Sequence, residues 1–225
     1  MRIWTALGPI LIATLAACAP ADRVAKVVSF AGDATLKDTV AATRPEPEGF
    51  GLYVYLLAMP GADRGKVDGL VRGFACNFEA LDLLAPPAKP SETALILLPV
   101  TRGHPPDSPY ATLRAAYSAE YARRLMRRAE TPPRDTTGRV FVVASNVALS
   151  DPDRDPEAPA VVTDITLYAP DQIADYVVTL RDRLGSGEVR GFQSPRLLML
   201  SYAAAVAEVV RSLGMTSTAS AAADC

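Results

Sequence analysis

The only histidine of the chain, His104, is the side chain best suited to proton transfer near neutral pH. It follows an apolar run at residues 94–98 and precedes Ser108-Pro109, a pair typical of a helix N-terminus. Open α/β sheets often bind ligands at such a strand-to-helix loop. His104 could act there as a general base with Asp107, and Arg102 could hold an anionic ligand. An exposed loop histidine and a surface ion pair are the simpler interpretation.

The sequence lacks a complete catalytic set. The nucleophile motif Gly-x-Ser-x-Gly does not occur, since Ser118, Ser145 and Ser150 have no such glycines beside them. The segment Gly61–Val67 stands where a phosphate-binding loop would stand, between an apolar run and a helical pattern. It has three residues rather than four between its glycines and no hydroxyl after its lysine, so we interpret it as a turn. These observations favour a protein that is not an enzyme.

Three aspartates alternate after the third apolar run, at Asp151, Asp153 and Asp155. Oxygen ligands at this spacing suggest calcium, but the EF-hand pattern also requires glycine at its sixth position and glutamate at its twelfth. Pro156 and Val162 stand there instead. We interpret the segment as a solvated loop and predict neither a metal nor another cofactor.

Four arginines form the strongest charge cluster, at Arg123, Arg124, Arg127 and Arg128, near the end of a predicted helix. Cations at a helix C-terminus offset the helix dipole, which would be a purely structural role. The alternative is contact with anionic lipid headgroups or with a cell-wall polymer. The formal net charge of −2 over the whole chain gives no reason to expect a nucleic-acid partner.

The segment Leu15-Ala16-Ala17-Cys18 resembles the lipobox of bacterial lipoproteins at all four positions. It follows Arg2 and an apolar run, the layout of a secretory signal with a charged start and small residues before the cut. The resemblance implies cleavage before Cys18, a diacylglycerol thioether on its sulfur, and usually an acyl group such as palmitate on its amine. An ordinary signal peptide or an uncleaved anchor is the alternative, but about 15 apolar residues is short of a membrane span.

The lipobox resemblance also implies a location and a class of partner. A protein modified in this way would be tethered to the bacterial cell envelope and face the periplasm. Ala19, in place of the aspartate of the enteric retention signal, favours sorting to the outer membrane. Besides the membrane itself, the expected partner is an envelope protein or a cell-wall component.

Two further cysteines, Cys76 and Cys225, could form a disulfide in such an oxidising compartment. The bond would hold the low-complexity tail at residues 215–225, which is otherwise expected to be flexible. The alternative is that Cys76 is a small buried residue and Cys225 a free terminal thiol.

Three short apolar runs predict interior strands, at residues 50–57, 94–98 and 140–144. Helical patterns near 65–84 and 108–129 separate them, which indicates parallel pairing through crossover connections. Gly69 and Gly73 in the first helical pattern indicate tight packing or a break there. An alternating run at 161–168 predicts an edge strand, and later helices are predicted to begin at Pro170 and at Pro195.

We therefore predict a single α/β domain at residues 50–214, with a mainly parallel sheet between helices and room for an antiparallel edge strand. An α+β arrangement is the alternative. Residues 1–17 are predicted to be a signal peptide, and residues 18–49 a lipid-anchored N-terminus with a linker or edge segment. The predicted function is a non-enzymatic envelope lipoprotein that binds a partner. The alternative is a small-molecule hydrolase or ligand-binding domain that uses the loop after the second strand.

Overall fold

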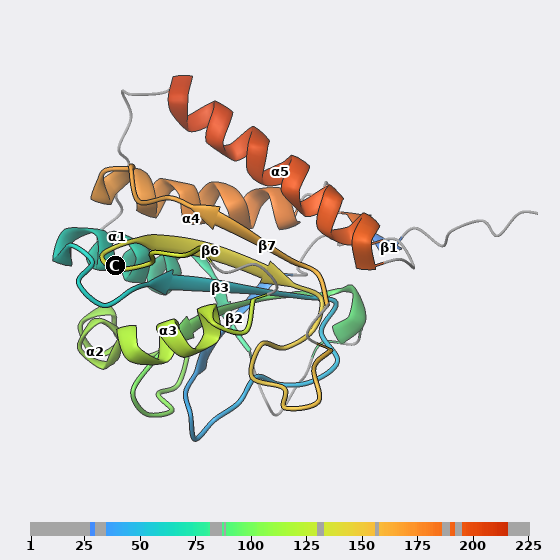
Figure 1. Ribbon diagram of the computed structural model, residues 1–225, viewed down its shortest axis with the longest axis horizontal. Helices are drawn as coiled ribbons and strands as arrows, with labels where there is room; N and C mark the ends of the chain where they lie inside the picture. Colours follow the sequence, from blue (N-terminus) through green and yellow to red (C-terminus); the bar gives the residue numbers. More distant parts are fainter. Residues whose placement is uncertain are drawn as a thin grey trace, which may run out of the picture.

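The computed structural model describes residues 28–29, 35–81, 87, 89–129, 133–155, 158–185, 190–191 and 195–215. Six strands in this part of the chain form one sheet with helices on both faces (Figure 1). Across the sheet, the strands stand in the order β4 (Glu79–Ala80), β2 (Thr35–Val40), β5 (Ala94–Pro99), β3 (Leu52–Ala58), β6 (Val140–Ser145) and β7 (Ala160–Asp164). The architecture is an α/β fold, as the sequence predicts.

The sheet is mixed rather than uniform in strand direction. β2 pairs in parallel with β4 and β5, and β5 pairs in parallel with β3. β6 is antiparallel to β3, and β7 at the edge is antiparallel to β6. The prediction that residues 140–144 join the sheet in parallel was wrong, whereas the alternating run does contain an edge strand.

β6 starts beside the carboxyl end of β3 because the chain that precedes it is hydrogen-bonded there. The amide of Gly138 donates to the carbonyl of Pro60 at 2.9 Å, and the amide of Met59 donates to the carbonyl of Arg139 at 2.8 Å. Gly61 and Gly138 have φ angles of +84° and +71°, which glycine adopts without strain. The chain therefore enters β6 where β3 ends, and the two strands run in opposite directions.

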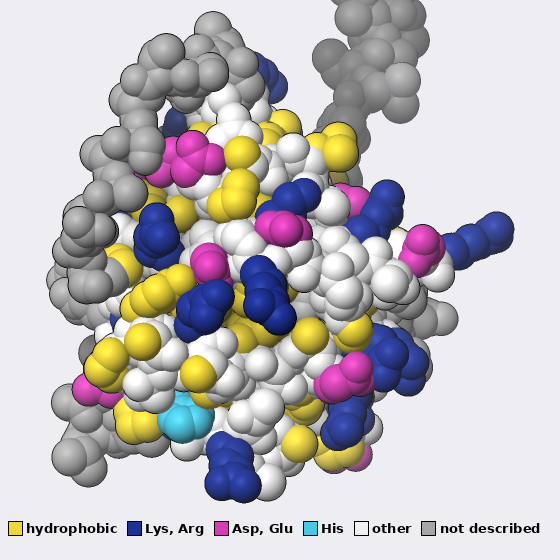
Figure 2. Space-filling model, turned by 90° about the vertical axis from the view of Figure 1, so that its left-hand side faces the viewer, with side chains coloured by type: hydrophobic (Ala, Val, Ile, Leu, Met, Phe, Trp, Pro, Cys, Tyr) yellow, Lys and Arg dark blue, Asp and Glu magenta, His cyan; other side chains and the backbone are white. Residues whose placement is uncertain are grey.

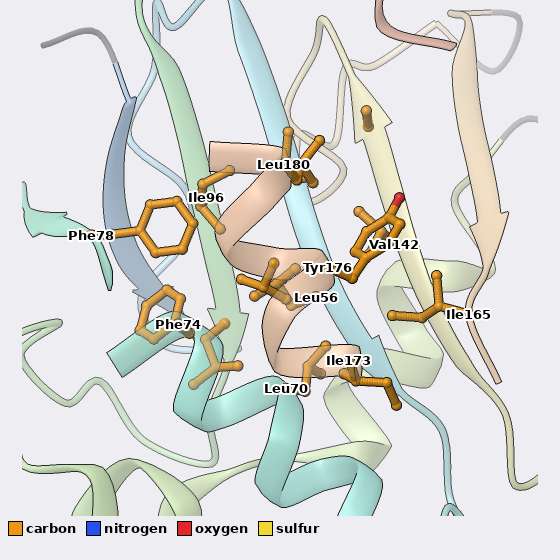
Figure 3. Packing of buried hydrophobic residues seen from close by; sticks show 14 of the residues in the cluster. Leu56, Leu70, Phe74, Phe78, Ile96, Val142, Ile165, Ile173, Tyr176 and Leu180 are labelled. Carbon is orange, nitrogen blue, oxygen red and sulfur yellow. The ribbon is translucent and has the colours of Figure 1, made fainter. Parts of the chain in front are cut away.

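One face of the sheet carries most of the helical cover. It consists of α1 (Arg64–Asn77), α4 (Pro170–Gly185) and the outer helix α5 (Pro195–Met215). The short α2 (Tyr110–Ala116) adds Leu113 and Ala116 to the same apolar cluster. Leu70 and Phe74 of α1 and Ile173 and Tyr176 of α4 pack onto the apolar side chains of the strands (Figure 3). α4 begins at Pro170, as predicted.

The other face of the sheet is covered by α3 (Ala119–Met126) and by loops. Leu125 and Met126 of α3 pack against a second apolar cluster that includes Tyr55, Leu57 and Phe141. All positions of β3, β5 and β6 are buried, which confirms that these runs form interior strands. Figure 1 shows α5 and α3 on opposite sides of the sheet.

The single helix predicted for residues 108–129 is broken into α2 and α3. The break lies at Tyr117 and Ser118, where Tyr117 forms an antiparallel bridge with Val100. The Tyr117 hydroxyl accepts a hydrogen bond from the Ala58 amide at 2.5 Å and donates to the Ala58 carbonyl at 3.1 Å. Ser118 Oγ accepts a hydrogen bond from the backbone amide of Tyr121 at 3.2 Å and so caps the N-terminus of α3. The prediction of a continuous helix was wrong because these contacts with distant strands hold the break.

α1 is shorter than its helical pattern, which was predicted to continue to about residue 84. It ends at Asn77, and Phe78 has extended backbone angles. Glu79 and Ala80 then pair in parallel with Leu36 and Lys37 of β2. Pairing with β2 therefore takes the place of the helical pattern at Glu79 and Ala80.

Glycines allow α1 and α4 to approach each other closely. Gly65, Gly69 and Gly73 recur at every fourth position of α1 and so share one face. A Cβ at Gly69 would lie 2.0 Å from the carbonyl oxygen of Pro170, and one at Gly73 would lie 2.8 Å from Cβ of Val177. Of the two predicted outcomes, tight packing is the one observed.

The folded domain also includes part of the segment that the sequence assigns to a linker or edge. β2 lies between β4 and β5 inside the sheet, so residues 35–49 belong to the domain. A second, two-stranded sheet pairs β1 (Val28–Ser29) with β8 (Arg190–Gly191) in antiparallel register. The predicted signal segment at 1–17, Cys18 and residues 216–225 of the predicted tail lie outside the described residues.

Candidate functional site

Two adjoining cavities open on the α3 face, where the segment 45–50 meets the loop 146–152 that follows β6. They measure about 410 Å³ and about 290 Å³, and Pro45 and Ser150 line both. The larger is formed by the two loop segments, and the smaller reaches across to α3 and its C-terminal turn. We call the two cavities together the Glu46 cleft, after the buried carboxylate beside them.

Glu46 joins the two loop segments through its carboxylate. The residue is only 5% exposed. Its Oε1 accepts from the Tyr55 hydroxyl at 2.7 Å and from the Ser150 amide at 3.2 Å, and its Oε2 accepts from Ser150 Oγ. Burial raises the pKa of Glu46, against the opposing effects of these hydrogen bonds and of the Arg128 charge.

The local sequence explains why Glu46 points into the protein. It stands between Pro45 and Pro47, which favour an extended chain with few internal hydrogen bonds. Tyr53 and Tyr55 present their hydroxyls on the same face of β3, because alternate strand residues share a face. Tyr55 binds the carboxylate, and Tyr53 donates to the carbonyl of Pro47 at 2.9 Å. The segment is thereby held beneath the sheet.

Ser150 is placed as an anchor of its loop and not as a nucleophile. Its hydroxyl donates to Glu46, which resembles a nucleophile beside a base. Acyl transfer also requires free hydrogen-bond donors for the developing oxyanion. The neighbouring amides are occupied, since the Leu149 amide donates to the Tyr55 hydroxyl at 2.7 Å and the Ser150 amide donates to Glu46. The contacts of Ser150 with Glu46 therefore join the two loop segments at the cleft wall.

The four predicted arginines have different surroundings. Arg128 donates to the carbonyls of the loop after β6, at 3.2 Å to Leu149 and 2.8 Å to Ser150, and so fixes that loop. Arg123 pairs with Glu120 on the exposed surface. Arg127 is exposed beyond the last turn of α3.

Arg124 is the arginine best placed to meet a ligand. Its exposed side chain lines the smaller cavity, and it forms no hydrogen bond or ion pair with the described residues. Tyr121 lines the same cavity, and burial raises its pKa to about 12, so its hydroxyl stays protonated at neutral pH. The smaller cavity therefore offers a free guanidinium beside a phenol, a combination suited to a carboxylate or phosphate.

The larger cavity has the opposite charge. The acidic residues Glu46, Glu48 and Asp151 line it. Asn146 also lines it, and its buried Oδ1 has no hydrogen-bond partner in the described part of the chain. Carboxylates and an amide oxygen accept hydrogen bonds from an ammonium group. The two cavities thus form a cleft with a cationic and an anionic end.

The predicted ligand-binding residues of the histidine loop do not line this cleft. They are Arg102, His104 and Asp107. The backbone carbonyl of His104 accepts from Thr39 Oγ1 and from Arg44 Nη1, the latter at 3.3 Å, which ties the loop to the end of β2. Its half-buried side chain reaches the surface at the end of the molecule shown in Figure 2. Arg102 and Asp107 are exposed. On this face, basic and acidic side chains are interspersed rather than gathered by sign.

The remaining sequence candidates have local structural roles. Asp151 Oδ1 accepts from the Asp153 amide at 2.8 Å, within the loop after β6. No group of three possible metal ligands occurs in the residues that the structure describes. In the segment 61–67, Gly61 forms a turn and Asp63 caps α1 by accepting from the Lys66 amide at 3.2 Å.

Cys76 lies near the end of α1 and is disulfide-bonded. Its partner is outside the described residues, as are Cys18 and Cys225. A Cys18 sulfur consumed in a thioether could not form a disulfide. The pairing of Cys76 with Cys225 therefore stays a prediction that is compatible with lipidation.

The sequence did not predict the Glu46 cleft, because residues 18–49 were assigned to a lipid-anchored N-terminus with a linker or edge segment. A signal was present in the two tyrosines of β3, whose hydroxyls share a buried face and require partners there. A glutamate enclosed by prolines directly before that strand was the nearest candidate. The contact with Ser150, which is far away in sequence, could not be read from either segment.

The chain gives no match in comparisons with protein-family models, with curated proteins or with solved structures. None of the described helices has the length and apolar character required to cross a membrane.

Proposed function

We propose that the protein is a lipid-anchored envelope protein whose α/β domain is a non-enzymatic binding module. The anchor rests on the lipobox resemblance, which assigns Cys18 as the modified residue and the periplasmic side of the outer membrane as the location. The binding role rests on the Glu46 cleft. Its single most informative feature is Arg124, whose guanidinium has no ion pair among the described residues and lines a cavity adjoining a second cavity with three acidic residues.

The charges of the cleft define the ligand class that fits it. A compact polar molecule with one anionic and one cationic group could pair with Arg124 at one end and with Glu48 and Asp151 at the other. A short peptide has a carboxylate at its carboxyl end and can have an ammonium at its amino end or on a diamino side chain. Peptide stems of the cell wall are such ligands in the proposed compartment, and we propose them as the first class to test.

Replacing Arg124 with glutamate is expected to weaken binding of soluble, peptide-bearing cell-wall fragments about tenfold or more, which corresponds to the loss of roughly 1.4 kcal/mol. The reason is that the change replaces the unpaired cation of the smaller cavity with an anion. Isothermal titration of the purified mature protein measures the dissociation constant.

The matched control for this measurement is Arg123→Glu. Arg123 belongs to the same helix and arginine cluster but pairs with Glu120 and does not line the cleft. The control is expected to bind like the wild type. Equal weakening by both changes would point to general charge attraction, and absence of binding by the wild type would reject the proposed ligand class.

A further inference from the structure

The outer helix α5 has an apolar face that no described residue covers. Its inner side is buried through residues such as Met199, Tyr202, Val206 and Val209. On its outer side, Leu200 is 64% exposed and Val210 is 38% exposed, with exposed Ala204 and Ala207 between them. Their spacing of three to four residues places them on one face of the helix, and this face ends at exposed Arg211, which is paired with Glu208. We call these four residues the outer α5 face.

The first described residues, Val28 and Ser29, lie close in the fold to the amino end of this helix. Val28 pairs with Gly191 in the small sheet of β1 and β8, and α5 begins at Pro195, directly after β8 (Figure 1). Cys18 precedes Val28 by 10 residues, which span at most about 35 Å when fully extended. A lipid on Cys18 would therefore keep α5 close to the membrane that holds the anchor.

We infer that the outer α5 face rests on the lipid surface to which the protein is anchored. This inference depends on the proposed lipidation. The tether makes contact with the surface an intramolecular event at high effective concentration, so a small apolar face suffices. Leucine and valine side chains can enter the boundary between headgroups and acyl chains, and the alanines let the helix approach closely.

A second copy of the chain is a less suitable occupant. The face from Leu200 to Val210 is about 15 Å long and one helix wide. Such an area is far below the roughly 800 Å² per partner that stable protein interfaces bury. The lipid surface needs no such area, because the anchor supplies most of the attachment.

The orientation has a consequence for the Glu46 cleft. α5 and α3 lie on opposite sides of the sheet, so a molecule resting on α5 presents α3 and the cleft away from the membrane (Figure 1). Arg124 would then face soluble or cell-wall ligands rather than the headgroups of the anchoring membrane. Of the two ligand sources predicted for the arginine cluster, this orientation favours the cell-wall polymer.

Single-tryptophan fluorescence in vesicles tests the orientation. The only tryptophan, Trp4, belongs to the predicted signal segment, so the mature protein with Leu200→Trp would contain one indole. The lipidated variant is reconstituted into vesicles of phosphatidylethanolamine and phosphatidylglycerol, with or without bromine on the acyl chains. Its emission is expected to shift to shorter wavelength and to lose most of its intensity in the brominated vesicles. Val210→Trp repeats the measurement at the other end of the face.

Leu167→Trp is the control. Leu167 is 99% exposed, in the turn between β7 and α4, at the end of the molecule opposite the amino end of α5. Its emission is expected to be unaffected by bromine. If the Leu200→Trp variant floats with the vesicles but its emission is not quenched, the orientation alone is overturned. A concentration-dependent blue shift without quenching would also overturn it and would indicate a second copy. Protein that does not float would reject the lipid anchor and the orientation together.

Discussion

Replacing Gly69 with alanine is expected to lower the free energy of unfolding by about 3 kcal/mol or more, the upper range for overpacking. The added Cβ would lie 2.0 Å from the carbonyl oxygen of Pro170, a backbone atom that cannot move without shifting the start of α4. Alanine improves helix propensity by only about 1 kcal/mol, so the clash dominates. Denaturant unfolding followed by circular dichroism measures the change.

Gly65→Ala is the matched control, because it lies on the same helix and faces the same proline. A Cβ there would meet side-chain atoms, at 3.0 Å from Asp63 Oδ1 and 3.1 Å from Pro170 Cγ, near an exposed helix end. Small shifts relieve these contacts, and the stability is expected to change by less than about 1 kcal/mol. A Gly69→Ala protein as stable as the wild type would show that α1 and α4 are farther apart than described.

Replacing Glu46 with alanine is expected to cost about 2–4 kcal/mol of stability, because it leaves buried donors without an acceptor. The carboxylate is the acceptor for the Tyr55 hydroxyl and for both the amide and hydroxyl of Ser150. Glu120→Gln is the surface control. Glu120 pairs with Arg123 on the exposed surface, and this ion pair should contribute less than about 1 kcal/mol to the free energy of unfolding. Equal effects of the two changes would contradict the role of Glu46 in joining the loops.

The pH dependence of Glu46→Gln tests the sign of its pKa shift. Because burial raises the pKa of Glu46 above its ordinary value of 4.5, the folded state binds the proton more tightly than the unfolded state. The contribution of Glu46 to stability is therefore fully present below about pH 4.5 and falls as pH rises through the folded-state pKa. The wild type is expected to lose stability relative to Glu46→Gln over this range. A relative gain would mean that the hydrogen bonds outweigh burial.

The sequence predicted those elements whose signals are local. β3, β5 and β6 are continuous apolar runs, and α4 begins at Pro170, as predicted. The direction of a strand within the sheet, by contrast, could not be predicted from a local sequence pattern. The reversal of β6 depends on hydrogen bonds between Met59–Pro60 and Gly138–Arg139, which lie far apart in the sequence. The break at Tyr117 likewise depends on a tyrosine hydroxyl that binds the backbone of Ala58.

The candidate site was only partly predictable for the same reason. The sequence identified Arg124 as one of four clustered arginines. The helical pattern could not distinguish its role from that of Arg128, which binds a loop, or of Arg123, which forms a surface ion pair. Glu46 gave no catalytic or metal-binding motif. Its role follows from Ser150, whose loop meets it only in the folded protein.

Intact mass spectrometry of the mature protein is the most direct test of the proposed function. We expect an N-terminus at Cys18 with the added mass of a diacylglycerol group and usually of an acyl chain. A Cys18→Ser variant is expected to carry no lipid, and the mature wild type should show no tryptophan absorption because Trp4 has been removed. An N-terminus elsewhere, or Cys18 without added lipid mass, would contradict the assignment of this chain as an anchored envelope protein.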